Sequence, residues 1–110
     1  MSNPDRPELT RHFVASLQAV RADHALTVLG AILNSDHRAD YARIAVPTLL
    51  LHARHDVAVP PEVVAWLRER VPGARGVTLD VDGHLPHVVA PDAVAAALRE
   101  FLGVGAAPAV

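Results

Sequence analysis

The sequence of 110 residues has no cysteine, no long apolar run and little net charge. Without cysteine there are no disulfide bonds and no thiol catalysis, which fits a cytoplasmic protein. No run approaches the roughly 18 apolar residues of a membrane span, and the N-terminus has no apolar signal core. A formal charge of −2 gives no basis for binding nucleic acid or an anionic membrane. We therefore expect one soluble cytoplasmic domain.

A strand–helix–strand pattern lies between residues 46 and 91. Residues 46–51 form a short apolar run, which predicts a strand buried on both faces. Residues 60–71 begin with two prolines and carry apolar side chains at helical spacing. Residues 76–81 alternate apolar and polar side chains, as a strand does, and a turn follows them. The pattern predicts an α/β fold with two parallel strands and flanking helices.

Two polar residues, Asp56 and His84, follow the two predicted strands. Because parallel strands joined in this way have a right-handed connection, the loops after them open at the same end of the sheet. That end is where ligands bind in open α/β sheets, so we expect the two side chains to meet. A carboxylate beside an imidazole fixes the ring tautomer and stabilises the imidazolium that forms when the histidine takes a proton from a nucleophile.

Simpler interpretations exist for these residues. Asp56 could be an ordinary loop carboxylate, and His84 could be a turn residue. Four histidines lie in or next to the two loops and could in principle gather around a zinc ion: His52, His55, His84 and His87. No pair of them has a recognised structural-zinc spacing on a predicted helix. We therefore expect neither a metal site nor a cofactor.

Further helices are predicted on both sides of this unit. Residues 7–20 and 23–33 each carry an apolar stripe at helical spacing. A polar connector, 34–41, follows them. Residues 91–102 begin with proline and end before a glycine, which predicts a last helix. The small residues of the tail, 103–110, predict disorder.

From about residue 36 to residue 102 the sequence resembles the C-terminal part of an α/β-hydrolase. The motifs are I-x-V-P-T-L-L-L-H before the first loop, H-D-x-x-V-P around Asp56, D-G-H-x-P-H around His84, and a final F-L-G. Residues 34–41 and 83–91 are similar to the branch of that superfamily that holds RsbQ and the strigolactone and karrikin receptors. The resemblance implies that Asp56 and His84 are the acid and the histidine of a Ser-Asp-His triad.

The same resemblance implies a division of the chain. Residues 1–33 would be the end of a helical lid and the helix that returns the chain to the sheet, and residues 34–102 the C-terminal hydrolase segment. The connector would support the loop that carries the acid. Phe13 and Leu17 would be candidates to line a pocket, although packing in a core is the simpler explanation for each of them.

The serine of such a triad is missing from the sequence. A hydrolase of this kind places its nucleophile in a G-x-S-x-G elbow, and none of the three serines has flanking glycines: Ser2, Ser16 and Ser35. A glycine-rich oxyanion loop is also absent, although one donor of such a loop contributes about 10²–10³ in rate. Two parallel strands also make a poorly covered sheet. We therefore predict an inactive and marginally stable or self-associating chain, which is one part of a longer or split hydrolase.

Two classes of function remain open. In the first, the complete protein hydrolyses a small hydrophobic ester, lactone or amide with His84 as base and Asp56 as its partner. In the second, the pocket binds a small hydrophobic ligand without turnover, and the protein signals through a partner protein. An inactive fragment is a third possibility. A missing N-terminal half or a signalling protein would be the binding partner.

Overall fold

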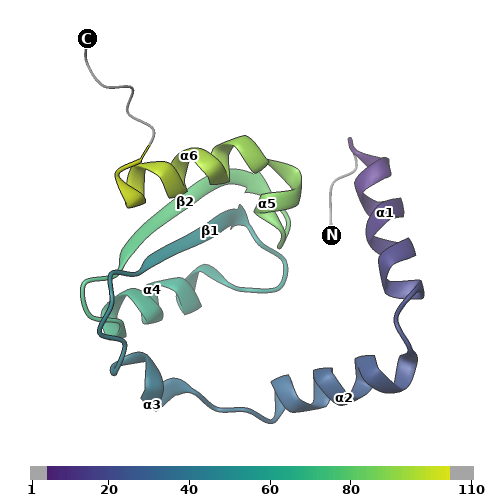
Figure 1. The fold of residues 1–110 in the computed structure, drawn as a ribbon, viewed down its shortest axis with the longest axis horizontal. Helices are drawn as coiled ribbons and strands as arrows, with labels where there is room; N and C mark the ends of the chain where they lie inside the picture. The colour runs from purple at the N-terminus through teal and green to yellow at the C-terminus, as the bar shows by residue number, and fades with distance from the viewer. Residues whose placement is uncertain (1–4, 105–110) are drawn as a thin grey trace.

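The computed structural model describes residues 5–104 and has an α/β architecture (Figure 1). In chain order the elements are α1 (Pro7–Gln18), α2 (Ala22–Leu33), α3 (Arg38–Tyr41), β1 (Leu49–His55), α4 (Pro61–Arg70), β2 (Arg75–Asp82), α5 (Pro86–Val89) and α6 (Pro91–Leu102). The predicted fold class, with two parallel strands and flanking helices, is confirmed. Most of the tail predicted to be disordered lies outside the described residues.

The two strands pair in parallel and are joined by α4, as the sequence predicts. Helix α4 packs on both strands, while α5 and α6 pack on β2. Figure 1 shows α4 and α6 on opposite faces of the sheet. The loops that follow the two strands therefore open at the same end of the sheet, as parallel pairing requires.

Strand β1 differs from its prediction in both position and burial. It begins at Leu49 and continues to His55, so the strand predicted over residues 46–51 starts three residues later and ends four residues later than expected. Backbone pairing with β2 extends the strand through these residues although their side chains are mostly polar. The prediction that the apolar run is buried on both faces was also wrong, because residues 49–51 are only half-buried. Strand β1 has no neighbour on its outer edge within residues 5–104.

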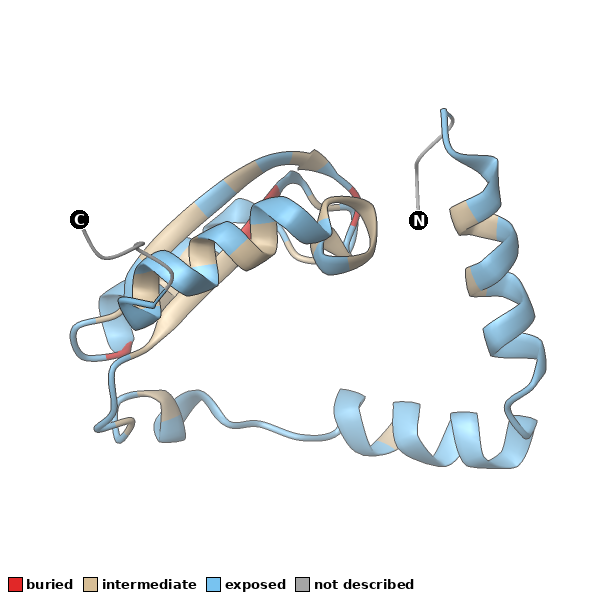
Figure 2. Cartoon of the chain, turned by 45° about the horizontal axis from the view of Figure 1, so that its top comes forward, coloured by how far each residue is buried: buried red, intermediate tan, exposed pale blue. Residues whose placement is uncertain are grey.

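The buried core is small (Figure 2) and includes two residues of β1 and the residue that ends α4. Ala53 and Val71 are 1% and 2% exposed, and His52 is 7% exposed. Residues 38–104, called here the packed unit, contain all three.

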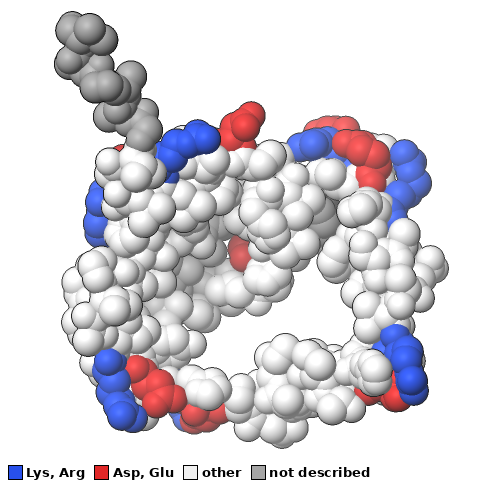
Figure 3. All heavy atoms as spheres, viewed as in Figure 1, with Lys and Arg blue, Asp and Glu red and all other residues white. Residues whose placement is uncertain are grey.

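Helices α1 and α2, with the residues around them, form an extended arm, defined here as residues 5–37. Figure 2 shows almost all of this arm in the exposed colour. The arm returns to the packed unit at its start, where Arg6 Nη1 donates to the Val89 carbonyl oxygen at 2.6 Å. An opening remains between the arm and the packed unit when all atoms are drawn (Figure 3), and it is bordered mainly by residues other than Lys, Arg, Asp and Glu.

Two short helices were not predicted. Helix α3 interrupts the polar connector, and its Tyr41 ring packs edge-on against Trp66 of α4 with 5.8 Å between the ring centroids. The connector therefore contacts the helix that follows the acid loop. Helix α5 lies between His84 and α6, which ends at Gly103 in the left-handed conformation with φ 66°. Over the described part of the chain, every helix is too short or too polar to span a membrane.

Candidate active site

Asp56 is the first residue after β1, and the loop folds back on its carboxylate. Its Oδ1 accepts hydrogen bonds from the backbone N–H groups of Ala58 at 2.8 Å and Val59 at 3.0 Å. This local turn is typical of aspartate, whose short side chain reaches the backbone two or three residues later. Only 6% of the side chain is exposed. The loop's own backbone thus helps to hold the carboxylate in place.

His84 reaches the same place from the end of β2. The turn passes through Gly83, which is buried and has a φ of 91°, a conformation that suits glycine because it lacks a Cβ. His84 Nδ1 lies 3.0 Å from Asp56 Oδ2 and 3.1 Å from Oδ1. The prediction that these two side chains meet agrees with the structure.

The Asp56 carboxylate is held in its charged form. Burial raises its pKa, but hydrogen bonds from His84 and from the backbone of Ala58 and Val59 outweigh this and lower the pKa from 3.8 to about 2. An ionised carboxylate can only accept hydrogen bonds, so Nδ1 of His84 must carry the proton that it donates. In the neutral ring, Nε2 then has a free lone pair. Because the His84 side chain is 49% exposed, this nitrogen is available to take a proton from a group brought to it.

The other predicted candidates have separate partners. His52 Nε2 donates to the Val59 carbonyl oxygen at 3.3 Å, which ties β1 to the acid loop. His55 Nδ1 lies 2.6 Å from Asp82 Oδ1. Within residues 5–104 no group of three or more His, Asp or Glu side chains is arranged to hold a metal ion. The sequence did not indicate the pairing of His55 with Asp82, although each lies within two residues of a predicted site residue.

A groove of about 320 Å³ runs along β1 to the Asp56–His84 pair. It is lined mainly by apolar residues: Leu49, Leu50, Leu51, His52, Ala53, Asp56, Val59, Val64, Leu67, His84 and Pro86. Five of these are consecutive residues of β1. Since consecutive strand residues point to opposite faces of a sheet, a groove lined by all five lies at the edge of the strand. Phe13 and Leu17, the predicted pocket residues, do not line it.

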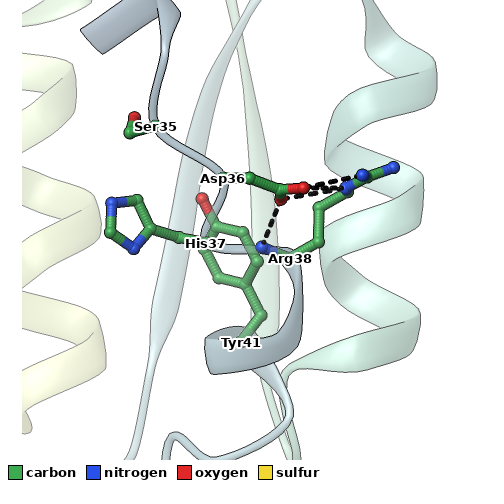
Figure 4. A pocket seen from close by; sticks show the side chains of 5 residues that line it. All are labelled: Ser35, Asp36, His37, Arg38 and Tyr41. Atoms are coloured by element: carbon green, nitrogen blue, oxygen red, sulfur yellow. Dashed lines mark hydrogen bonds and ion pairs between the residues drawn. The ribbon is translucent and has the colours of Figure 1, made fainter. Parts of the chain in front are cut away.

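A second hollow, of about 440 Å³, lies on the connector and α3 (Figure 4). The Arg38 side chain and backbone N–H donate hydrogen bonds to the Asp36 carboxylate and lower its pKa to about 2. Ser35 Oγ donates to the Ile32 carbonyl oxygen at 2.7 Å. Ser16 Oγ is bonded in the same way to the His12 carbonyl oxygen at 2.9 Å. Each hydroxyl thus donates to a backbone carbonyl oxygen and not to a base, so neither Ser35 of this hollow nor Ser16 of α1 is an activated nucleophile.

Comparisons with known proteins place the chain in a family. A family model described as TAP-like protein matches residues 32–110. Strigolactone esterase D14 of Arabidopsis thaliana is 37% identical over 99 residues, which are 89% of this chain and 37% of that protein. Karrikin insensitive 2 receptor CA of Petunia hybrida is 34% identical over 85 residues, 76% of this chain and 32% of the receptor.

A solved structure is similar over the arm as well as the packed unit. The crystal structure of a hydrolase from Pseudomonas aeruginosa PA01 has a TM-score of 0.82 and 30% sequence identity, and the match covers 93% of this chain and 40% of that one. The chain spans about a third of the length of the curated relatives named above. It belongs to the TAP-like family and has the C-terminal portion of an α/β-hydrolase fold.

Proposed function

We propose that Asp56 and His84 are the acid and the base of a Ser-His-Asp triad that hydrolyses a small hydrophobic ester, lactone or amide. The observation that carries this proposal is the pair itself: a nearly buried, ionised carboxylate that accepts a hydrogen bond from Nδ1 of a half-exposed imidazole. The strigolactone esterase and the Pseudomonas hydrolase support the same reaction class.

Each of the two side chains has a defined part in this reaction. His84 Nε2 takes the proton of a serine hydroxyl while that oxygen attacks the acyl carbon, and the imidazolium returns the proton to the leaving group. Asp56 holds the ring in the required tautomer and balances its positive charge. Water then repeats the cycle to release the acid. The serine and the donors for the oxyanion come from polypeptide other than residues 5–104.

The free edge of β1 is where we expect that polypeptide to bind. An unpaired strand edge presents backbone N–H and C=O groups to a further strand, and the groove beside it leads to His84. In the Pseudomonas hydrolase, more than half of the chain has no counterpart here, although the arm and the packed unit together match it. We infer that equivalent polypeptide fills the opening seen in Figure 3.

The test compares ester turnover by His84→Ala and His87→Ala variants, each purified from its native cells with any polypeptide bound to it. We expect His84→Ala to abolish turnover of small aryl esters. His87 is an exposed histidine of α5 close to the site, and its variant should keep the activity. Full turnover by His84→Ala would overturn the triad assignment.

A second candidate is a receptor that binds a small hydrophobic ligand without hydrolysing it. The relative that favours it is the karrikin insensitive 2 receptor, together with the lack of a glycine-flanked serine in the sequence. In that case the unaltered assembly would bind small lactones but release no product, and His84→Ala would leave binding intact.

A further inference from the structure

A second carboxylate–imidazole pair lies directly beside the first. His55 precedes Asp56 in the sequence, and Asp82 lies two residues before His84. His55 Nδ1 and Asp82 Oδ1 are 2.6 Å apart, which is shorter than either contact between His84 and Asp56. Each strand end thus contributes one imidazole and one carboxylate, and the two pairs cross between the same two strands.

The pair sits where the register of the sheet changes. Ala53 is opposite Leu79, but His55 is opposite Asp82, so between these two pairs β2 contains one more residue than β1. Such a bulge redirects the side chains that follow it. Immediately after the bulge, the N–H of Gly83 donates to the His55 carbonyl oxygen at 3.1 Å. One backbone and one side-chain hydrogen bond therefore join the two strand ends immediately before Asp56 and His84.

We propose that His55 and Asp82 are a positioning pair that holds the strand ends in the shifted register and so keeps His84 within hydrogen-bonding distance of Asp56. The side-chain hydrogen bond of the pair joins His55 to Asp82 and involves neither Asp56 nor His84. The proposal deepens the function proposed above and rests on it for the roles of His84 and Asp56.

The contribution of this pair is local. The side chains of His55 and Asp82 are 66% and 59% exposed, and exposed ion pairs add little to global stability. A matched pair shows the difference: Arg54 and Asp80 also join β1 to β2, at 3.4 Å and with similar exposure. Arg54 is the residue before His55 and Asp80 lies two residues before Asp82, so along both strands that pair is farther from Asp56 and His84. Removing it should leave the site unchanged.

The pKa of Asp56 reports the position of His84. Its largest influences are burial, which raises it, and the hydrogen bonds from His84 and from the backbone of Ala58 and Val59, which lower it. A rise in this pKa on substitution of His55 that substitution of Arg54, also a loss of positive charge near the end of β1, does not reproduce therefore means that the His84 hydrogen bond has moved. The carboxyl carbon of Asp56 can be followed by nuclear magnetic resonance in the 110-residue chain labelled with ¹³C aspartate.

The experiment titrates Asp56 in the unaltered chain and in three variants. We expect a pKa near 2 in the unaltered chain and a rise toward 3.8 in His55→Leu, which loses the donor. His55→Asn places an amide donor close to the position of Nδ1 and should restore the low value. Arg54→Gln should leave the pKa unchanged. The urea midpoint of all three should stay close to that of the unaltered chain.

The outcomes separate the two proposals. If Asp56 of the unaltered chain titrates near 3.8, the Asp56–His84 pair is wrong, and the proposed function fails together with the positioning pair. If the unaltered chain and His55→Leu both titrate near 2, only the positioning pair is overturned. It is also overturned if Arg54→Gln raises the pKa as much as His55→Leu does, or if His55→Asn fails to lower it again.

Discussion

The packed unit and the arm differ in whether they bury any apolar side chain. In the packed unit Ala53 of β1 and Val71 at the end of α4 are almost fully buried, whereas no described apolar residue of the arm is buried, and its Leu26 and Leu33 are 70% and 74% exposed. Both regions have amphipathic sequences. The arm differs because no other described element covers its apolar stripe.

The candidate site and the exposed apolar stripe lie in different regions of the chain: the site in the packed unit and the stripe on the arm. The hydrogen bonds that hold the Asp56 loop and join Asp56 to His84 all lie within the packed unit, so none of them comes from the arm. The apolar stripe of the arm is of the kind that marks a binding surface in proteins. The chain therefore holds the Asp56–His84 pair within the packed unit and leaves the apolar stripe of the arm exposed.

The largest effect is expected from a charge placed in the core of the packed unit. Ala53→Asp buries a carboxylate without a partner and should lower the free energy of unfolding by more than about 4 kcal/mol. That is most of the stability of a small domain, for which the usual range is about 5–15 kcal/mol. Urea denaturation followed by circular dichroism measures it. An unchanged transition would show that the packed unit is not the stable part of the chain.

A smaller effect is expected at the glycine that turns the chain into His84. Gly83→Ala forces a residue with a Cβ to adopt a φ of 91°, which should cost about 1–3 kcal/mol. Gly30 in the arm is the matched control, because an added Cβ there meets no atom within 4 Å. Gly30→Ala should raise the helix content of α2 and leave the urea transition of the packed unit in place. Equal destabilisation by the two variants would contradict the expectation that the packed unit depends on Gly83 and not on Gly30 of the arm.

The loss of stability at acid pH should distinguish the two carboxylates whose pKa is lowered, Asp56 and Asp36. The pKa of Asp56 is lowered to about 2, so its stabilising effect is complete above 3.8 and is lost as the pH falls from 3.8 towards 2. Asp36 has the same direction and window, but its side chain is 58% exposed, so solvent weakens its effect. Asp56→Asn should flatten the loss of stability in this window, as measured by urea midpoints. Asp36→Asn should change it less, and the reverse order would contradict the account.

The smallest effect on the free energy of unfolding is expected in the arm. Leu26→Asp changes an exposed residue and should alter this free energy by no more than about 0.5 kcal/mol. If the isolated chain self-associates through the arm, as its exposed stripe suggests, the same substitution should shift it to monomers in analytical ultracentrifugation. A monomeric unaltered chain with a cooperative melt above about 60 °C, which is high among mesophilic domains, would contradict the expected need for a partner.

The sequence predicted the parts of the fold in which pattern and packing agree. Helix α6 begins and ends at the predicted residues because proline and glycine mark its ends. The predicted end of β1 was wrong because His52 and Arg54 are polar, and their place in the strand is decided by pairing with β2 rather than by apolar character. Burial of its leucines was overestimated because one covering layer is incomplete, which a local pattern does not show.

One of the two carboxylate–imidazole pairs at the candidate site was predicted from the sequence, and the other was not. Asp56 and His84 could be paired from the sequence because parallel strands bring the loops after them together. The His55–Asp82 pair could not, since it depends on a bulge that shifts the register by one residue. The sequence offered no means of assigning partners to the other histidines of the two loops. The structure assigns a separate partner to three of the four histidines: His52, His55 and His84.

The most direct test of the central claim is fluorophosphonate labelling of the chain purified from its native cells, with mass spectrometry to find the labelled residue. We expect one labelled serine in a G-x-S-x-G segment, either in the same polypeptide or in one bound to it. Labelling should be lost in His84→Ala and kept in His87→Ala. If no serine in the purified assembly is labelled, or if His84→Ala is labelled as well as the unaltered protein, Asp56 and His84 are not the acid and base of a serine hydrolase.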